Sequence, residues 1–122
     1  MKKVLFASRY LHVVLLIVLS LCCYVQPSCA TSPKSVDLTY DAGEGTLSVK
    51  IDHYTVSAGM HHVELVEIKK NGVSVGKNEY KSQPTDSIFT YSYKIAAAKG
   101  DIIEVTASCN LWGRKTASLT IP

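Results

Sequence analysis

Beyond residue 30, four side chains offer a nitrogen or sulfur ligand to a metal ion. They are His53, His61, His62 and Cys109, and the stretch contains no other histidine or cysteine. Imidazole nitrogen combined with thiolate sulfur suits a soft or borderline metal ion. A single thiol can equally be a small buried side chain in the core, and a histidine at a strand end can simply hydrogen-bond to a loop carbonyl. The choice between these roles depends on whether the fold brings the four residues together.

Alternating apolar and polar residues predict that the elements carrying these side chains are short β-strands. Asn71-Gly72 is typical of a two-residue hairpin whose turn needs positive φ, and Lys99-Gly100 marks another turn. We therefore predict an all-β fold, a seven-stranded immunoglobulin-like β-sandwich. The apolar positions that define the clearest strands are Leu47, Val49 and Ile51; Val63 and Leu65, with Val66 and Ile68 on the opposite face; Phe89, Tyr91, Tyr93 and Ile95; Ile103, Val105, Ala107 and Cys109; and Ala117, Leu119 and Ile121.

This architecture predicts where the candidate ligands lie. If consecutive strands are antiparallel, the second strand ends near His53, the third begins near His61, and the sixth ends at Cys109, all at one end of the sandwich. Trp112 follows in the next turn, where we expect a core or rim anchor. Neighbouring strand residues point to opposite faces, so His62 faces away from His61 and is expected to be exposed to solvent.

Residues 1–30 have the pattern of a cleaved secretory signal. Met1-Lys2-Lys3 supplies a positive start, residues 11–25 are almost wholly apolar, and Ser28-Cys29-Ala30 offers small residues for cleavage after Ala30. A membrane anchor would need about 20 apolar residues, and extending the run backwards would bury Arg9. We expect an exported protein, periplasmic or secreted, whose mature part is a single domain over residues 31–122.

Removal of this leader changes the charge and cysteine content. Three of the 13 basic residues lie in residues 1–30, whereas all 10 acidic residues follow it, so the mature domain is neutral before histidine is counted. No basic patch remains, and we expect neither a nucleic acid partner nor membrane contact after cleavage. Only Cys109 remains of the four cysteines, so the domain forms no internal disulfide and must be stabilised by packing.

Two segments of the predicted domain share a pattern with a known family. The first is residues 61–68, HHVELVEI, followed by Asn71-Gly72; the second is residues 100–107, GDIIEVTA, followed by SCNLWG at 108–113. The first resembles the histidine-led strand of the superoxide reductase (desulfoferrodoxin) iron-binding domain. The second resembles that family's closing strand and its Cys-Asn-x-His-Gly turn. The resemblance covers roughly residues 36–121. It implies a seven-stranded immunoglobulin-like fold and a mononuclear ferrous centre with an axial thiolate and four equatorial histidines. The reaction it implies is one-electron reduction of superoxide to peroxide.

The family pattern matches this chain only in part. Cys109 matches the axial thiolate, Asn110 the asparagine beside it, and His61 the histidine that opens the third strand. Trp112 stands where the histidine of the turn is expected, and His53 lies two residues before the position of another. No histidine lies between residue 30 and His53, and the Glu-Lys pair of the family's early loop is also missing.

These observations lead to two functional hypotheses. The first is an exported superoxide reductase-like domain with part of the iron site lost, which binds metal through Cys109, His61 and His53 and has little or no superoxide reductase activity. Iron is the metal that the resemblance implies, whereas three ligands with an open position suit zinc or copper. The second is a metal-free immunoglobulin-like binding module. Either one leaves a protein or redox partner to be identified. A Cys-His nucleophile has little support, because no orienting group or oxyanion donor accompanies the pair.

Overall fold

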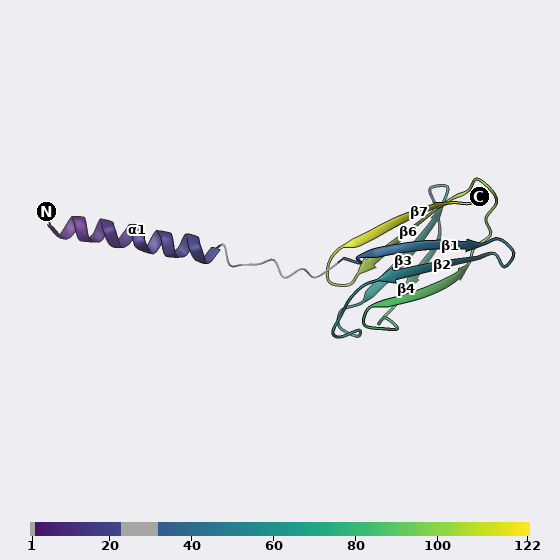
Figure 1. Ribbon diagram of the computed structural model, residues 1–122, viewed down its shortest axis with the longest axis horizontal. Helices are drawn as coiled ribbons and strands as arrows, with labels where there is room; N and C mark the ends of the chain where they lie inside the picture. Colours follow the sequence, from purple (N-terminus) through teal and green to yellow (C-terminus); the bar gives the residue numbers. More distant parts are fainter. Residues whose placement is uncertain (1, 23–31) are drawn as a thin grey trace.

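The computed structural model describes residues 2–22 and 32–122, which form one helix and two β-sheets (Figure 1). The predicted cleavage site after Ala30 lies outside the described residues. No described helix combines the length and apolar character needed to cross a membrane. The elements are α1 (Lys2–Cys22), β1 (Ser35–Asp41), β2 (Thr46–Asp52), β3 (Val63–Lys70), β4 (Val73–Glu79), β5 (Ile88–Lys94), β6 (Ile102–Cys109) and β7 (Arg114–Thr120).

The seven strands form a three-stranded sheet in the order β1-β2-β5 and a four-stranded sheet in the order β4-β3-β6-β7. Every pairing is antiparallel. The predicted all-β, seven-stranded immunoglobulin-like sandwich is therefore confirmed. Its fourth strand pairs with the third, whereas in constant-type immunoglobulin domains the fourth strand belongs to the other sheet.

The core lies between the two sheets and follows the predicted alternation. Leu47, Val49 and Ile51 of β2 are fully buried, as are Ile103 and Val105 of β6. The residues between them along each strand are mostly more exposed. The period of two that is visible in the sequence therefore identifies the inward faces of these strands correctly.

Strand β3 departs from the prediction. Val63, Val66 and Ile68 are all fully buried, whereas Leu65 is half-buried. The pairing of β3 with β6 shifts register between Val63 and Leu65, which is a β-bulge. An extra residue in one strand reverses the alternation beyond it. The prediction that Val63 and Leu65 share one face, with Val66 and Ile68 on the other, was therefore wrong.

The hairpin between β3 and β4 has the predicted turn. Asn71 has a φ of 52° and Gly72 a φ of 81°, the left-handed conformation that two-residue hairpins require. The Asn71 side chain also donates to the carboxylate of Asp101 at 2.9 Å and accepts from the backbone N–H of Ile102 at 2.9 Å. The turn is thus joined to the start of β6 at the end of the sandwich that lies away from His53.

Three tyrosines join the end of β4 to β5 and so link the two sheets. Tyr80 stacks on Tyr91 with ring centroids 4.2 Å apart, and its hydroxyl lies 2.7 Å from that of Tyr93. Burial, and then the neighbouring Tyr80, raises the pKa of Tyr91 to about 12. Burial, and then the hydrogen bond with Tyr80, also raises the pKa of Tyr93. The hydroxyls of Tyr91 and Tyr93 therefore stay protonated at neutral pH.

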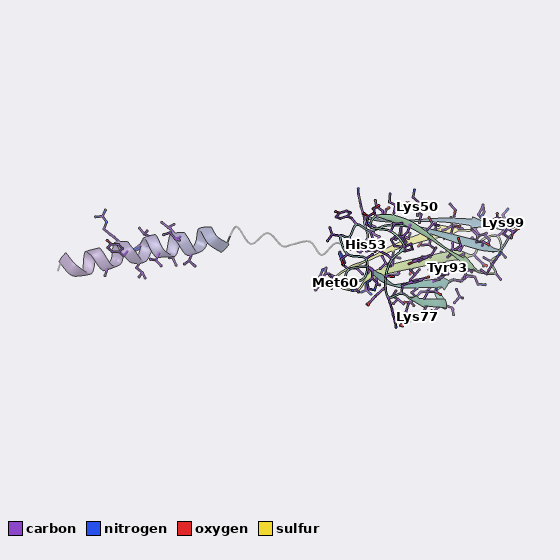
Figure 2. All side chains as sticks on the ribbon, turned by 90° about the horizontal axis from the view of Figure 1, so that it is seen from below. Lys50, His53, Met60, Lys77, Tyr93 and Lys99 are labelled. Atoms are coloured by element: carbon purple, nitrogen blue, oxygen red, sulfur yellow. The ribbon has the colours of Figure 1, made fainter. Side chains whose placement is uncertain are left out.

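The two connections that carry the candidate ligands lie at the opposite end from Lys99. Figure 2 shows His53 and Met60 together at one end of the sandwich, with Lys99 at the other. The turn after β6 reaches the same end, because the backbone N–H of Asn110 donates to the carbonyl of His62 at 3.0 Å. The antiparallel topology therefore produces the gathering that the strand order predicts.

Candidate metal centre

His53, His61 and Cys109 form one cluster of potential metal ligands. Each contributes one ligand atom, and these atoms all lie within 4.8 Å of one another. A tetrahedral ion with bonds of about 2.0–2.3 Å holds its ligand atoms roughly 3.3–3.8 Å apart, so closing this cluster around an ion takes a movement on the order of 1 Å. It is the only cluster of this kind found among the described residues.

His53 is a buried histidine held from several sides. It follows the last residue of β2, and its backbone N–H donates to the carbonyl of Ser87 at 2.9 Å. Its side chain is 1% exposed. Ring nitrogen Nδ1 lies 2.8 Å from Oε1 of Gln83. The ring meets that of His61 edge to face, with centroids 4.7 Å apart and planes at 79°.

His61 comes from the loop between β2 and β3. Its backbone N–H and that of Met60 both donate to the carbonyl of Ser57, at 2.8 and 3.0 Å, so the loop turns tightly just before it. Its Nε2 is buried and has no hydrogen-bond partner within residues 2–22 and 32–122. Burial most of all, and then the charges of His53 and His62, lower the pKa of His61 below 6.5. The neutral imidazole is therefore favoured, which is the form that binds a metal.

Cys109 ends β6 with its side chain turned inward. It is 7% exposed and lies opposite Val63 in the ladder with β3. Its backbone N–H donates to the carbonyl of Gly113 at 2.9 Å, which closes the turn into β7. The backbone N–H of Leu111 points at Sγ from 3.5 Å. This donor lies where it would stabilise the negative charge of a thiolate.

Asn110 attaches the turn after Cys109 to the loop that carries His61. Its Oδ1 accepts from the backbone N–H of His62 at 2.9 Å, and its Nδ2 donates to the carbonyl of Met60 at 3.0 Å. Together with the backbone bond from Asn110 to the carbonyl of His62, these contacts hold the residues on either side of His61. Asn110, which the sequence singles out only as the match to the asparagine of the family's turn, therefore links the two ligand-bearing segments.

His62 differs from its predicted environment, whereas Trp112 agrees with one of its two predicted positions. His62 is 7% exposed, and its Nε2 lies 3.1 Å from the carbonyl of Tyr80, so the prediction of solvent exposure was wrong. Its exclusion from the ligand cluster agrees with the prediction that it points away from His61. Trp112 is 74% exposed, so of its two expected positions, in the core or on the rim, the core is excluded.

Gln83 contacts the site and was missed by the sequence reasoning. It lies in the loop between β4 and β5, far from any candidate ligand in sequence, and is 5% exposed. A single glutamine before a proline in a polar loop carries no signal of burial. Only the three-dimensional arrangement reveals that its amide reaches His53.

The ligand set does not fit the five-ligand iron centre that the family resemblance implies. The described residues bring two imidazoles and one thiolate together. The turn residue Trp112, at the position of an expected histidine, offers no ligand atom. Three protein ligands with one open position suit a tetrahedral ion instead.

Comparison with known proteins finds similarity only to solved structures. No protein-family model matches the chain, and no curated protein is significantly similar to it. The superoxide reductase (neelaredoxin) from Ignicoccus hospitalis aligns with 16% identity over 75% of this chain and 79% of that one, with a TM-score of 0.46. A variant of that protein aligns with 14% identity over 79% and 85%, with a TM-score of 0.49. A superoxide reductase in the oxidized state aligns with 15% identity over 75% and 90%, with a TM-score of 0.48. Similarity at this level assigns no activity to this chain.

Proposed function

We propose that this protein binds one soft or borderline metal ion through His53, His61 and Cys109. The observation that carries the proposal is the convergence of three ligand atoms within 4.8 Å, one of them from a histidine whose buried Nε2 has no partner among the described residues. A buried polar atom left unpaired costs about 1–3 kcal/mol. Coordination of an ion would remove that cost for His61.

The donor set favours zinc or copper(I) over iron(II). Two imidazoles and a thiolate match the ligands of tetrahedral zinc, and thiolate sulfur is a preferred partner of copper(I). Iron remains the metal implied by the resemblance in residues 61–68 and 100–113. On this proposal the chain is a superoxide reductase-like domain whose site has fewer imidazoles and a different metal preference.

The chain's own residues would perform three tasks at such a site. The backbone N–H of Leu111 would stabilise the thiolate of Cys109 from 3.5 Å. The side chain of Asn110 would hold the His61 loop in place through the backbone of Met60 and His62. The bound ion would supply Lewis acidity at its open position. The third task would be the exclusion of water, because the residues His53 and Cys109 are only 1% and 7% exposed.

Metal analysis tests the proposal directly. The purified protein is reconstituted anaerobically with zinc, copper or iron, and its metal content is measured after removal of unbound ions. We expect about one equivalent of zinc or copper(I), lost in Cys109→Ala and in His61→Gln. His62→Gln is the matched control, because His62 is the neighbouring histidine, is itself buried, and lies outside the cluster. Absence of stoichiometric metal from the unmodified protein would refute the proposal.

A metal-free binding module is the second candidate, and exposed apolar side chains favour it. The two connections around the cluster expose Tyr54, Val56, Met60, Leu111 and Trp112. Such side chains at one end of a domain are typical of contact with another protein. This candidate stands if no metal binds. If metal does bind, the same side chains surround the site and suit a protein partner, including a redox partner.

We also propose that the protein is exported and that residues 1–30 are removed. The support is the sequence pattern of a positive start, an apolar run and small residues before residue 31. N-terminal sequencing of the exported protein is expected to begin at Thr31. Recovery of a mature protein that still carries residues 1–25 would refute this.

A further inference from the structure

Gln83 makes four hydrogen bonds at the site with the two ends of its amide. Its Nε2 donates to the carbonyl of His53 and to that of Thr85, both at 2.8 Å. Its Oε1 accepts from the backbone N–H of Val63 at 3.2 Å and lies 2.8 Å from Nδ1 of His53. All of these contacts form within the protein, since Gln83 is 5% exposed.

These contacts determine which end of the amide faces His53. Two carbonyl oxygens can be satisfied only by the NH₂ group, and the backbone N–H of Val63 only by the amide oxygen. The reversed orientation would place oxygen against two carbonyl oxygens and NH₂ against an N–H. Gln83 therefore presents oxygen to Nδ1 of His53.

The amide oxygen in turn determines the tautomer of His53. An oxygen 2.8 Å from a ring nitrogen requires that nitrogen to carry the proton, so Nδ1 of His53 is the donor. In a neutral imidazole the other nitrogen, Nε2, then bears the lone pair. Nε2 is thereby the ring atom that His53 can offer to a metal.

Gln83 also joins the two sheets at the site. His53 follows β2 in the three-stranded sheet, whereas Val63 begins β3 in the four-stranded sheet and lies opposite Cys109 in the ladder. One amide oxygen contacts both His53 and Val63. A displacement of Gln83 would therefore change both the ring orientation of His53 and the distance between its strand and that of Cys109.

We propose that Gln83 is a positioning residue that holds His53 in the Nδ1–H tautomer, so that Nε2 is the ring nitrogen that bears the lone pair and would bind a metal, an inference whose metal-binding part rests on the proposed function. Partners of this kind orient a ligating histidine and raise its basicity, and their loss typically weakens metal affinity about 10–100-fold. The part that concerns the tautomer rests only on the hydrogen bonds of the protein itself.

The tautomer is measured first, in metal-free protein labelled with ¹⁵N, by long-range ¹H–¹⁵N correlation at about pH 8, above the usual histidine pKa. We expect His53 to be Nδ1–H in the unmodified protein and in Gln83→Glu, whose carboxylate still accepts from Nδ1. In Gln83→Leu, which has no acceptor, we expect the Nε2–H form to appear. Both variants lose the bonds to the carbonyls of His53 and Thr85, so a purely structural role would affect them alike. An Nε2–H tautomer in the unmodified protein would overturn the proposal, even if neither variant folded.

Zinc affinity is measured second, by competition with a chromogenic chelator. We expect Gln83→Leu to bind zinc about 10–100-fold more weakly than the unmodified protein, and Gln83→Glu to recover most of that loss. Equal affinity and an unchanged tautomer in Gln83→Leu would overturn the positioning role. If the unmodified protein bound no metal but kept an Nδ1–H tautomer that depends on Gln83, the proposed function would fail, whereas the assignment of Gln83 as the partner that fixes His53 would stand.

Discussion

Replacement of Asn110 by alanine should loosen the loop that carries His61. The substitution removes the 2.9 Å bond from the backbone N–H of His62 and the 3.0 Å bond to the carbonyl of Met60. At a net contribution of about 0.5–1.5 kcal/mol for each bond, Asn110→Ala should lower the free energy of unfolding by about 1–3 kcal/mol. A loss of about 2 kcal/mol confined to the loop would shift its closed-to-open ratio roughly 30-fold, because 1.4 kcal/mol corresponds to a factor of ten.

Two assays separate the global effect of Asn110→Ala from the local one. Denaturant unfolding measures the change in stability, and native-state amide exchange at His62 measures local opening. Asn78→Ala is the matched control, because Asn78 makes one long bond of 3.4 Å to the carbonyl of Val66, away from the site. We expect the control to leave exchange at His62 unchanged. If Asn110→Ala altered neither stability by more than about 0.5 kcal/mol nor exchange at His62, Asn110 would not hold this loop.

Three further predictions follow from the core, the histidine cluster and the turn after β6. Ile103→Ala should cost about 2–5 kcal/mol in chemical denaturation because Ile103 is fully buried, whereas Leu65→Ala should cost about 1 kcal/mol; equal costs would contradict the bulge in β3. Because burial, above all, lowers the pKa of His61 below 6.5, the unfolded chain takes up this proton at higher pH than the folded chain does. The free energy of unfolding of metal-free protein should therefore fall as the pH decreases from about 6.5, less steeply in His61→Gln, and an identical pH dependence of the two proteins would contradict this cause. The iron-loaded protein should not accelerate the decay of superoxide beyond the rate in buffer, or should do so only slightly. The variant Trp112→His tests whether one restored imidazole changes this rate. Fast metal-dependent decay with the unmodified protein would show that a further ligand completes the site.

The sequence was sufficient to predict the parts of the site that depend on strand order. The alternation in β2 and β6 identified their buried faces, and antiparallel order alone placed His53, His61 and Cys109 at one end. These features follow from the backbone period of two and from chain connectivity, which leave little freedom.

Other features were not predictable because they depend on single local events. The bulge between Val63 and Leu65 adds a residue to one strand without any glycine or proline to mark it. The buried ring of His62 contacts the carbonyl of Tyr80, which is 18 residues away in the chain. Gln83 reaches His53 over 30 residues of chain. Such long-range polar contacts have no periodic signature.

The pairing of β3 with β6 sets the order in which the cluster can assemble. His53 and His61 flank one connection, so they approach each other early and with little loss of chain entropy. Cys109 joins them only when β6 pairs with β3, which closes a loop from Val63 to Cys109 in the ladder. From loop-closure entropy we therefore expect the thiolate to join the two imidazoles last. Capture of an ion by all three ligands would therefore report that β3 and β6 are paired, whereas an ion held by the two imidazoles alone would still exchange.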